Sequence, residues 1–194
     1  IGVGYNNIDV AAARERRVPV TNTPGVLNDA TADLAWALIL GITRRVGEGE
    51  RLVRGGGWKG FKFDFMLGSE LGDKQLGIVG YGGIGRAVAR RGRAFGMRIA
   101  YTSRTPKDDP DAEAMSLDRL LSTSDVVSLH CPLTPETRHL IDQPALARMK
   151  RSGYLINTSR GPVVDEKALA WALRTRLIAG AGLDVFECEP KVEP

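Results

Sequence analysis

The strongest chemical signal in the sequence is a glycine-rich turn, in which Gly80, Gly82 and Gly85 are spaced as G-x-G-x-x-G. An apolar run (75–80) that predicts a buried strand leads into the turn, and a helical pattern (83–96) follows it. Glycines in that setting let the backbone approach a phosphate group, while the N-terminus of the helix attracts its negative charge. The pattern predicts a dinucleotide site formed by Gly80, Tyr81, Gly82, Gly83, Ile84 and Gly85.

The residues after the next predicted strand (97–102) indicate which dinucleotide is bound. An acid about 20 positions beyond such a turn usually binds the ribose 2′-hydroxyl of NAD. This chain has Ser103, Arg104 and Thr105 there instead. A hydroxyl and a guanidinium suit a phosphate dianion, which a carboxylate would repel. We therefore predict NADP in preference to NAD, with NAD possible, although Arg104 could also be a solvent-facing loop residue.

Other polar residues follow the later predicted strands. Arg160 lies just past one strand, and Asp184 and Glu189 lie past the next. Ligands bind at the carboxyl edge of open parallel sheets, so these groups could serve a ligand or could form a structural ion pair. The segment LHCPLTPET (129–137) follows another strand and is expected to line an adenine pocket.

The histidines and cysteines carry weaker signals. His130 and His139 are the only histidines, and both are interpreted as packing or surface residues rather than as bases. Cys131 and Cys188 form no C-x-x-C motif and no paired framework, which favours a reducing cytoplasm. Since no His/Cys/carboxylate cluster has ligand spacing, no metal is expected.

Composition excludes several classes of protein. Hydrophobic residues make up 43% of the chain and charged residues 26%, as in soluble globular proteins. The apolar stretch AWALILGI (35–42) is too short to cross a bilayer, so no membrane association is expected. The net charge is +4, but the basic residues are scattered apart from ARRGR (89–93). That run is interpreted as a solvated helix face rather than as a nucleic-acid site.

Strands and helices alternate from residue 75 onwards. Strands are expected at 75–80, 97–102, 125–130, 153–159 and 178–186, and helices at 83–96, 116–124, within 135–150 and at 165–175. Because the strands are almost continuously apolar and helices separate them, they predict a parallel sheet covered on both faces. The fold class is therefore α/β, with a doubly wound sheet of the Rossmann type.

The first 74 residues follow a different pattern. PVTNTPG (19–25) predicts a short strand that runs into a turn. A long helix is predicted over 28–53, with one apolar row formed by Leu34, Leu38, Ile42 and Val46. The glycine-rich segment 54–74 is expected to be irregular and to pack on a partner or on a neighbouring domain.

Six segments together resemble the D-isomer-specific 2-hydroxyacid dehydrogenases, most closely the glyoxylate/hydroxypyruvate reductase branch. They are GVGYNNIDVAAA, NTPGVLNDATADLAWALIL, GIVGYGGIG, VSLHCPLTPETRHLI, INTSRGPVVDE and IAGAGLDVFECEP, in order over nearly the whole chain. The resemblance implies a cofactor domain inserted into a flavodoxin-like substrate domain. Residues 1–20 would be a remnant of the substrate domain, and 21–194 would be the NAD(P)-binding Rossmann domain, with a dimerisation helix and excursion over 28–72.

The resemblance also implies roles for single residues. Arg160 would bind the substrate carboxylate and polarise the 2-oxo group, with Val3 and Gly4 capping that carboxylate through their backbone. Glu189 would raise the pKa of a histidine that donates the proton and lies in a PHIG-like segment outside this sequence. Asp184 would hold the nicotinamide carboxamide. The other cofactor-binding residues are expected to be Thr31, Cys131, Pro132, Thr137, Thr158 and Ser159.

From the resemblance, the parent protein is expected to reduce glyoxylate or hydroxypyruvate to the D-2-hydroxy acid by hydride transfer from NADPH. D-3-phosphoglycerate and D-lactate are alternative substrates, and a dinucleotide-sensing corepressor is the alternative of another class. Since the sequence begins at Ile1 and lacks that histidine, it is expected to be part of a longer protein and inactive alone. A homodimer through the cofactor domain is also expected, with Trp36, Trp58 and FKFDFML (61–67) either at the interface or in the core.

Overall fold

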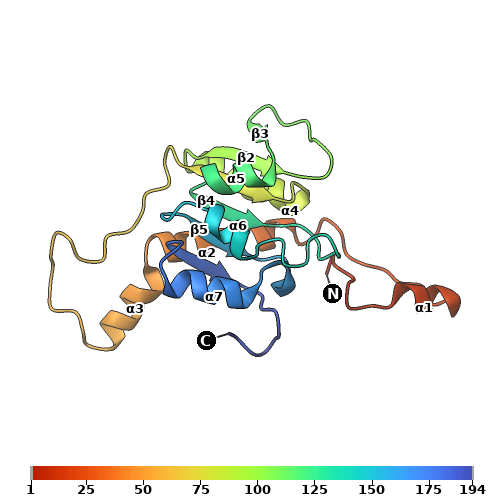
Figure 1. The fold of residues 1–194 in the computed structure, drawn as a ribbon, viewed down its shortest axis with the longest axis horizontal. Coiled ribbons are helices and arrows are strands. Elements are labelled where there is room, and N and C mark those ends of the chain that lie inside the picture. Colours follow the sequence, from red (N-terminus) through yellow and green to blue (C-terminus); the bar gives the residue numbers. More distant parts are fainter. Residues whose placement is uncertain (1, 194) are drawn as a thin grey trace.

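Six parallel strands form one sheet in the computed structural model, which describes residues 2–193 (Figure 1). They are β1 (Gln75–Val79), β2 (Arg98–Thr102), β3 (Ala112–Ala114), β4 (Val126–Leu129), β5 (Tyr154–Asn157) and β6 (Gly180–Leu183). Their spatial order is β3-β2-β1-β4-β5-β6, with every pairing parallel. The order reverses between β1 and β4, which is where open sheets of this kind bind ligands. The predicted Rossmann-type α/β fold is confirmed.

Helices cover both faces of the sheet. The helices within residues 2–193 are α1 (Val10–Glu15), α2 (Asn28–Thr43), α3 (Val46–Arg54), α4 (Gly83–Ala94), α5 (Leu117–Thr123), α6 (Gln143–Arg148), α7 (Glu166–Arg174) and the 3₁₀ turn η1 (Gly161–Val163), of which α2, α4, α5, α6 and α7 pack on the sheet. One apolar layer, which includes Trp36 and Ile78, lies between the sheet on one side and the helices α2 and α4 on the other. The other, which includes Leu146 and Leu155, lies beneath α5, α6 and α7. No helix within residues 2–193 is long and apolar enough to span a bilayer.

The helix predicted over 28–53 is two helices with a different buried face. Arg45 adopts a left-handed conformation (φ 56°), so the chain turns there and Val46 is exposed. In α2 the buried residues include Ala32, Ala35, Trp36 and Ile39, whereas Leu34 is exposed. The partly buried Leu38 packs against Gly182 of β6, where the absence of a side chain leaves room for the helix. Such partners cannot be read from the periodicity of a single helix.

Two local predictions are wrong. Residues 19–25 form no strand, because Pro19 and Pro24 lack the amide hydrogens that a ladder requires. Residues 135–140 form turns and a bend, and Ile141 forms an isolated parallel bridge with Val164, so no helix forms over 135–141. There the Thr137 hydroxyl accepts a bond from the Thr134 amide (2.8 Å) and donates one to the Pro132 carbonyl (2.7 Å), which competes with helical pairing. The edge strand β3 was not predicted, since three residues are too few to show a period.

Two segments extend away from the sheet on opposite sides (Figure 1). One is α1, which has no buried residue. The other is α3 with the segment that follows it, and that segment is irregular through residue 74 as predicted. The division of the chain at residue 20 stays a prediction.

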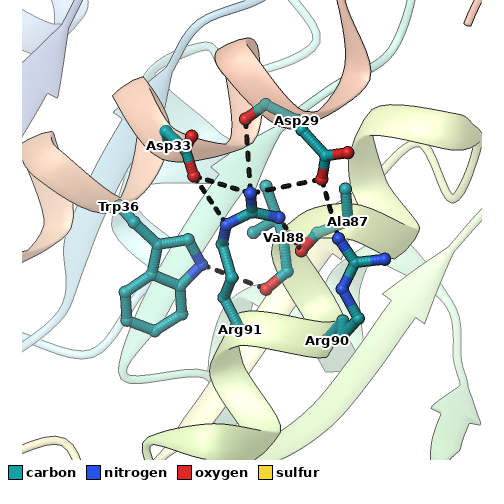
Figure 2. Close-up of polar contacts among 7 residues, drawn as sticks. All are labelled: Asp29, Asp33, Trp36, Ala87, Val88, Arg90 and Arg91. Carbon is teal, nitrogen blue, oxygen red and sulfur yellow. Dashed lines mark hydrogen bonds and ion pairs between the residues drawn. The ribbon is translucent and has the colours of Figure 1, made fainter.

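Side chains of α4 bind it to α2 (Figure 2). Arg91 donates to Asp33 (2.6 and 2.8 Å), and Arg90 pairs with Asp29 (2.7 Å). These ion pairs are largely exposed and stabilise the contact by only about 0–1 kcal/mol each. The Trp36 ring adds more, because it is buried and its Nε1 donates to the Val88 carbonyl (3.0 Å). The ARRGR run is therefore largely engaged in contacts within the protein, and α2 helps to position the helix that follows the glycine turn.

Candidate cofactor and substrate site

Two adjoining cavities open at the carboxyl edge of the sheet. The first, of about 520 Å³, lies between the glycine turn and the loop after β2. The second, of about 740 Å³, lies between the glycine turn, the end of β5 and the N-terminal segment. Both cavities are lined by Gly82, Arg104, His130, Cys131, Pro132 and Thr134. These shared walls make the two cavities one groove across the switch point of the sheet.

The glycine turn has the conformation that a phosphate cradle needs. Gly80 has a φ of +95°, and a Cβ added there would lie 2.6 Å from the Cys131 nitrogen, so only glycine fits. A Cβ at Gly85 would overlap the Gly80 carbonyl. At Gly82, the N-cap of α4, an added Cβ would meet no atom within 4 Å, so the start of the helix is open to the groove. This turn fits the pyrophosphate of a dinucleotide.

Asn28 also lines the groove, although its residue type and position in the sequence did not predict this. It is the first residue of α2, lines the second cavity, and lies against Gly83, where an added Cβ would be 2.5 Å from Asn28 Nδ2. In the sequence, an asparagine at the start of a helix cannot be distinguished from a capping residue. The predicted site residue Thr31 lies one turn further along α2 and lines neither cavity.

The loop after β2 contributes the predicted residues Ser103, Arg104 and Thr105 to the first cavity. The Ser103 hydroxyl donates to the Thr105 carbonyl (2.6 Å), which makes a tight turn. Lys107 also lines this cavity and was not predicted, because its direction depends on how the loop folds back. Two hydroxyl groups, of Ser103 and Thr105, and two cations, Arg104 and Lys107, therefore border the first cavity.

The end of β4 places His130 at the boundary between the cavities. Its Nε2 lies 2.8 Å from Ser128 Oγ, and burial lowers the pKa of His130 to about 4. The histidine is therefore neutral near pH 7, and it belongs to the groove rather than to packing alone. Burial also raises the pKa of the neighbouring Cys131 to about 11, so its thiol stays protonated. Pro132 and Thr137 line the first cavity, and the adenine pocket in this segment stays a prediction.

Arg160 is held at the end of β5 by its neighbours. Asn157 accepts bonds from the Ser159 amide (3.0 Å) and hydroxyl (2.8 Å), which shapes the turn before Arg160. The guanidinium donates to the Ser159 carbonyl (2.7 Å) and to Asn6 Oδ1 (2.9 Å), and it presses against Gly4, where any Cβ would overlap it.

The same cavity wall unites residues from distant parts of the chain. Arg160 lines the second cavity together with Val3, Gly4, Thr158 and Ser159. The structure thus brings the predicted substrate residues of the N-terminal segment to the predicted arginine at the end of β5.

The predicted carboxylates lie outside the two cavities. Asp184 follows β6 directly, where its amide donates to the Asn157 carbonyl (3.0 Å), but its side chain is exposed. Glu189 is exposed and accepts a bond from the Phe186 amide (2.9 Å). No ion pair joins Arg160 to either carboxylate within residues 2–193. The structural ion pair that the spacing left open is therefore absent from that described range.

His139 pairs instead with Glu187, at 2.7 Å from Nε2 to Oε1. His139 lies in the turns before α6 and Glu187 lies after β6, and neither residue lines either cavity. No three His, Cys, Asp or Glu side chains gather into a metal site in the part of the chain that the structure describes.

The low pKa of His130 predicts a pH dependence of stability. An unfolded histidine titrates near 6.5, so between about pH 6.5 and 4 the unfolded chain binds more protons than the folded one. Stability should fall over this range as the pH is lowered, by on the order of 2 kcal/mol from this residue. Urea unfolding at pH 7 and pH 4.5 should show a smaller loss for His130→Asn than for the unchanged protein. An equal loss of stability in the two proteins would contradict the low pKa of His130.

Comparison with known proteins agrees with this site. Residues 36–194 match the family model described as D-isomer specific 2-hydroxyacid dehydrogenase, NAD binding domain. A glyoxylate reductase of Thermococcus litoralis is 53% identical over 97% of this chain and 59% of its own length. A glyoxylate reductase of Korarchaeum cryptofilum is 54% identical over 97% of this chain and 58% of its own. This chain thus spans about three fifths of the length of these relatives.

Solved structures show the same relationship. A glyoxylate reductase from Paecilomyes thermophila superposes with a TM-score of 0.92 at 46% identity, covering 100% of this chain and 59% of that one. The D-lactate dehydrogenase from Aquifex aeolicus, complexed with NAD and lactic acid, superposes with a TM-score of 0.88 at 37% identity, covering 96% and 56%. With the glycine turn, the switch-point groove and the matched sequence in agreement, this chain belongs to the D-isomer-specific 2-hydroxyacid dehydrogenase family and contains its NAD-binding domain.

Proposed function

We propose that the full-length protein reduces a small 2-oxo acid, of the glyoxylate or hydroxypyruvate type, to the D-2-hydroxy acid with NADPH as reductant. The observation that carries the proposal is the single groove, in which a phosphate cradle and Arg160 line the same cavity. The names of the relatives support the reaction class, since two that are 53% and 54% identical are named glyoxylate reductases.

Arg160 is the group best placed to bind the acid. When bound, the dinucleotide supplies the hydride, and negative charge then develops on the 2-oxo oxygen. A guanidinium stabilises that charge and also binds a carboxylate through two parallel hydrogen bonds. Because Asn6 and Ser159 already hold the side chain, little reorganisation is needed at the moment of reaction. Val3 and Gly4, which lie beside Arg160 in the same cavity, would cap the carboxylate through their backbone.

The proton donor is proposed to lie outside this chain. His130 is poorly suited to that role, because its pKa of about 4 leaves it without a proton to give near pH 7. Glu189, exposed after β6, is free to pair with a histidine supplied by the rest of the protein. Asp184, at the end of β6, is proposed to hold the nicotinamide carboxamide.

Turnover by the full-length protein tests the proposal. NADPH oxidation should be measured with glyoxylate, hydroxypyruvate, pyruvate and 3-phosphohydroxypyruvate. Arg160→Lys should lower kcat/KM for the preferred acid by about 100-fold, since lysine cannot reproduce the bidentate contact, while NADPH binding is retained. Arg90→Lys, on the exposed face of α4, is the matched control. NADPH binding without turnover of any of these acids would instead favour a dinucleotide-sensing protein.

The NADP preference rests on the loop after β2. Ser103→Asp combined with Arg104→Ala replaces a donor and a cation by an acid that binds a free 2′-hydroxyl. The ratio of kcat/KM for NADPH to that for NADH should fall at least about 10-fold, the effect of losing a hydrogen bond to a charged group. Arg98→Ala, an exposed residue at the other end of the same strand, should leave the ratio unchanged. An unmoved ratio in the double variant would refute the preference.

We also propose a homodimer formed through α3 and the segment after it. Trp36 is buried in the core and is not available, but Phe61 and Phe63 are 81% and 90% exposed and Trp58 is 60% exposed. Monomeric proteins rarely expose so many large apolar side chains together. A second copy of the chain would cover them, as the position of this segment beyond the sheet allows (Figure 1).

Light scattering on the full-length protein should give twice the protomer mass. Phe61→Asp combined with Phe63→Asp should give one protomer mass, since two charges would then have to be buried at the interface. Leu173→Asp, on the exposed face of α7, is the control. A monomeric unchanged protein would refute the proposal.

A further inference from the structure

The loop after β2 is anchored by two stacked tyrosines. Tyr81 lies inside the glycine turn and Tyr101 lies on β2, and both are buried. Their ring centroids are 4.2 Å apart with an interplanar angle of 18°. The stack therefore joins the element that cradles the pyrophosphate to the strand that carries Ser103 and Arg104.

Both tyrosine hydroxyls bond to the far side of that loop. The Tyr101 hydroxyl accepts from the Lys107 amide and donates to the Lys107 carbonyl, each at 2.9 Å. The Tyr81 hydroxyl donates to Asp109 Oδ2 at 2.6 Å. Burial and the nearby carboxylate raise the pKa of Tyr81 to about 12, so this hydroxyl keeps its proton. The segment from Ser103 to Pro106 therefore lies between two anchored residues, Tyr101 and Lys107.

Arg93, in the last turn of α4, completes the anchor. Its NH2 donates to Asp109 Oδ1 at 2.7 Å, and the Asp111 amide donates to the same oxygen at 3.2 Å. Burial opposes a charge on Asp109, but the bonds from Arg93 and Tyr81 outweigh it and lower the pKa of Asp109. The carboxylate is therefore ionised, and Arg93 compensates its charge.

We propose that Tyr81, Asp109 and Arg93 are positioning residues that determine the preference for NADPH. They hold the loop so that Arg104 and Lys107 border the first cavity, and Arg93 neutralises a carboxylate that would otherwise repel a 2′-phosphate. NADH has no charged group at this position, so a displaced loop affects it less. The inference rests on the proposed NADP preference and extends it to residues that lie behind the ones that would touch the phosphate.

The test compares Tyr81→Phe and Asp109→Asn in the full-length protein. Each removes one bond of the anchor while conserving shape, and each should raise KM for NADPH about 5- to 20-fold relative to KM for NADH. Trp36→Phe is the matched control, because it removes a buried hydrogen bond to the same helix without touching the loop. It should lower the Tm and leave the NADPH/NADH ratio unchanged.

A second pair of variants separates charge from geometry. Arg93→Met leaves the Asp109 carboxylate without a cationic partner, although Tyr81 and the Asp111 amide still donate to it. This variant should also raise KM for NADPH selectively. Adding Asp109→Asn to Arg93→Met removes the uncompensated charge and should recover at least half of the lost preference on a logarithmic scale. A purely structural role predicts that the double variant loses as much as Arg93→Met alone, because the two residues share one bond, and that result would overturn the charge argument.

Two results would overturn the whole inference. If the unchanged protein prefers NADPH and Arg104→Ala weakens that preference, but Tyr81→Phe and Asp109→Asn move both KM values equally or not at all, the anchor has no role in specificity. The proposed NADP preference would then still stand. If the unchanged protein prefers NADH, the proposed preference and this inference fail together.

Discussion

The close approach of the glycine turn to the neighbouring strand ends is the constraint on which this site depends. The Gly80 amide donates to the Thr102 carbonyl of β2 (2.9 Å), and the His130 amide donates to the Val79 carbonyl (2.7 Å). Gly80 is thus held between β2 and β4 with no space for a side chain. That contact fixes where α4 begins, and the start of α4 divides the groove into a cavity on the β2 side and a cavity on the β5 side.

The groove that results is complementary to anions. Among the described residues that line it, the cationic side chains are Arg104, Lys107 and Arg160, and the carboxylate is Glu136. His130 and Cys131 remain uncharged near neutral pH, because burial disfavours their ionised forms. A dinucleotide and a 2-oxo acid both carry negative charge, so the same field attracts both partners of a hydride transfer. This balance agrees with the proposed reaction.

The sequence predicts the parts of this structure that depend on local pattern. Apolar runs locate the main strands, and the glycine spacing locates the turn, because both signals lie within a few residues. Contacts between distant residues are different. That Arg160 meets Gly4 followed from the family resemblance and not from spacing. The buried face of α2, the roles of Asn28 and Lys107, and the bond from Tyr81 to Asp109 could not be predicted, since each depends on what the fold brings opposite that residue.

The contacts of Arg93 limit how α4 can change. A helix advances by about 100° per residue, so a single insertion between Gly85 and Arg93 would turn the guanidinium away from Asp109. An insertion between Gly85 and Val88 would also rotate Val88 out of the core, where it is fully buried. Substitutions on the exposed side of α4 disturb neither contact. The exposed surface of α4 can therefore vary in composition. The number of residues between the glycine turn and Arg93 is fixed by two contacts, that of Arg93 with Asp109 and that of Val88 with the core.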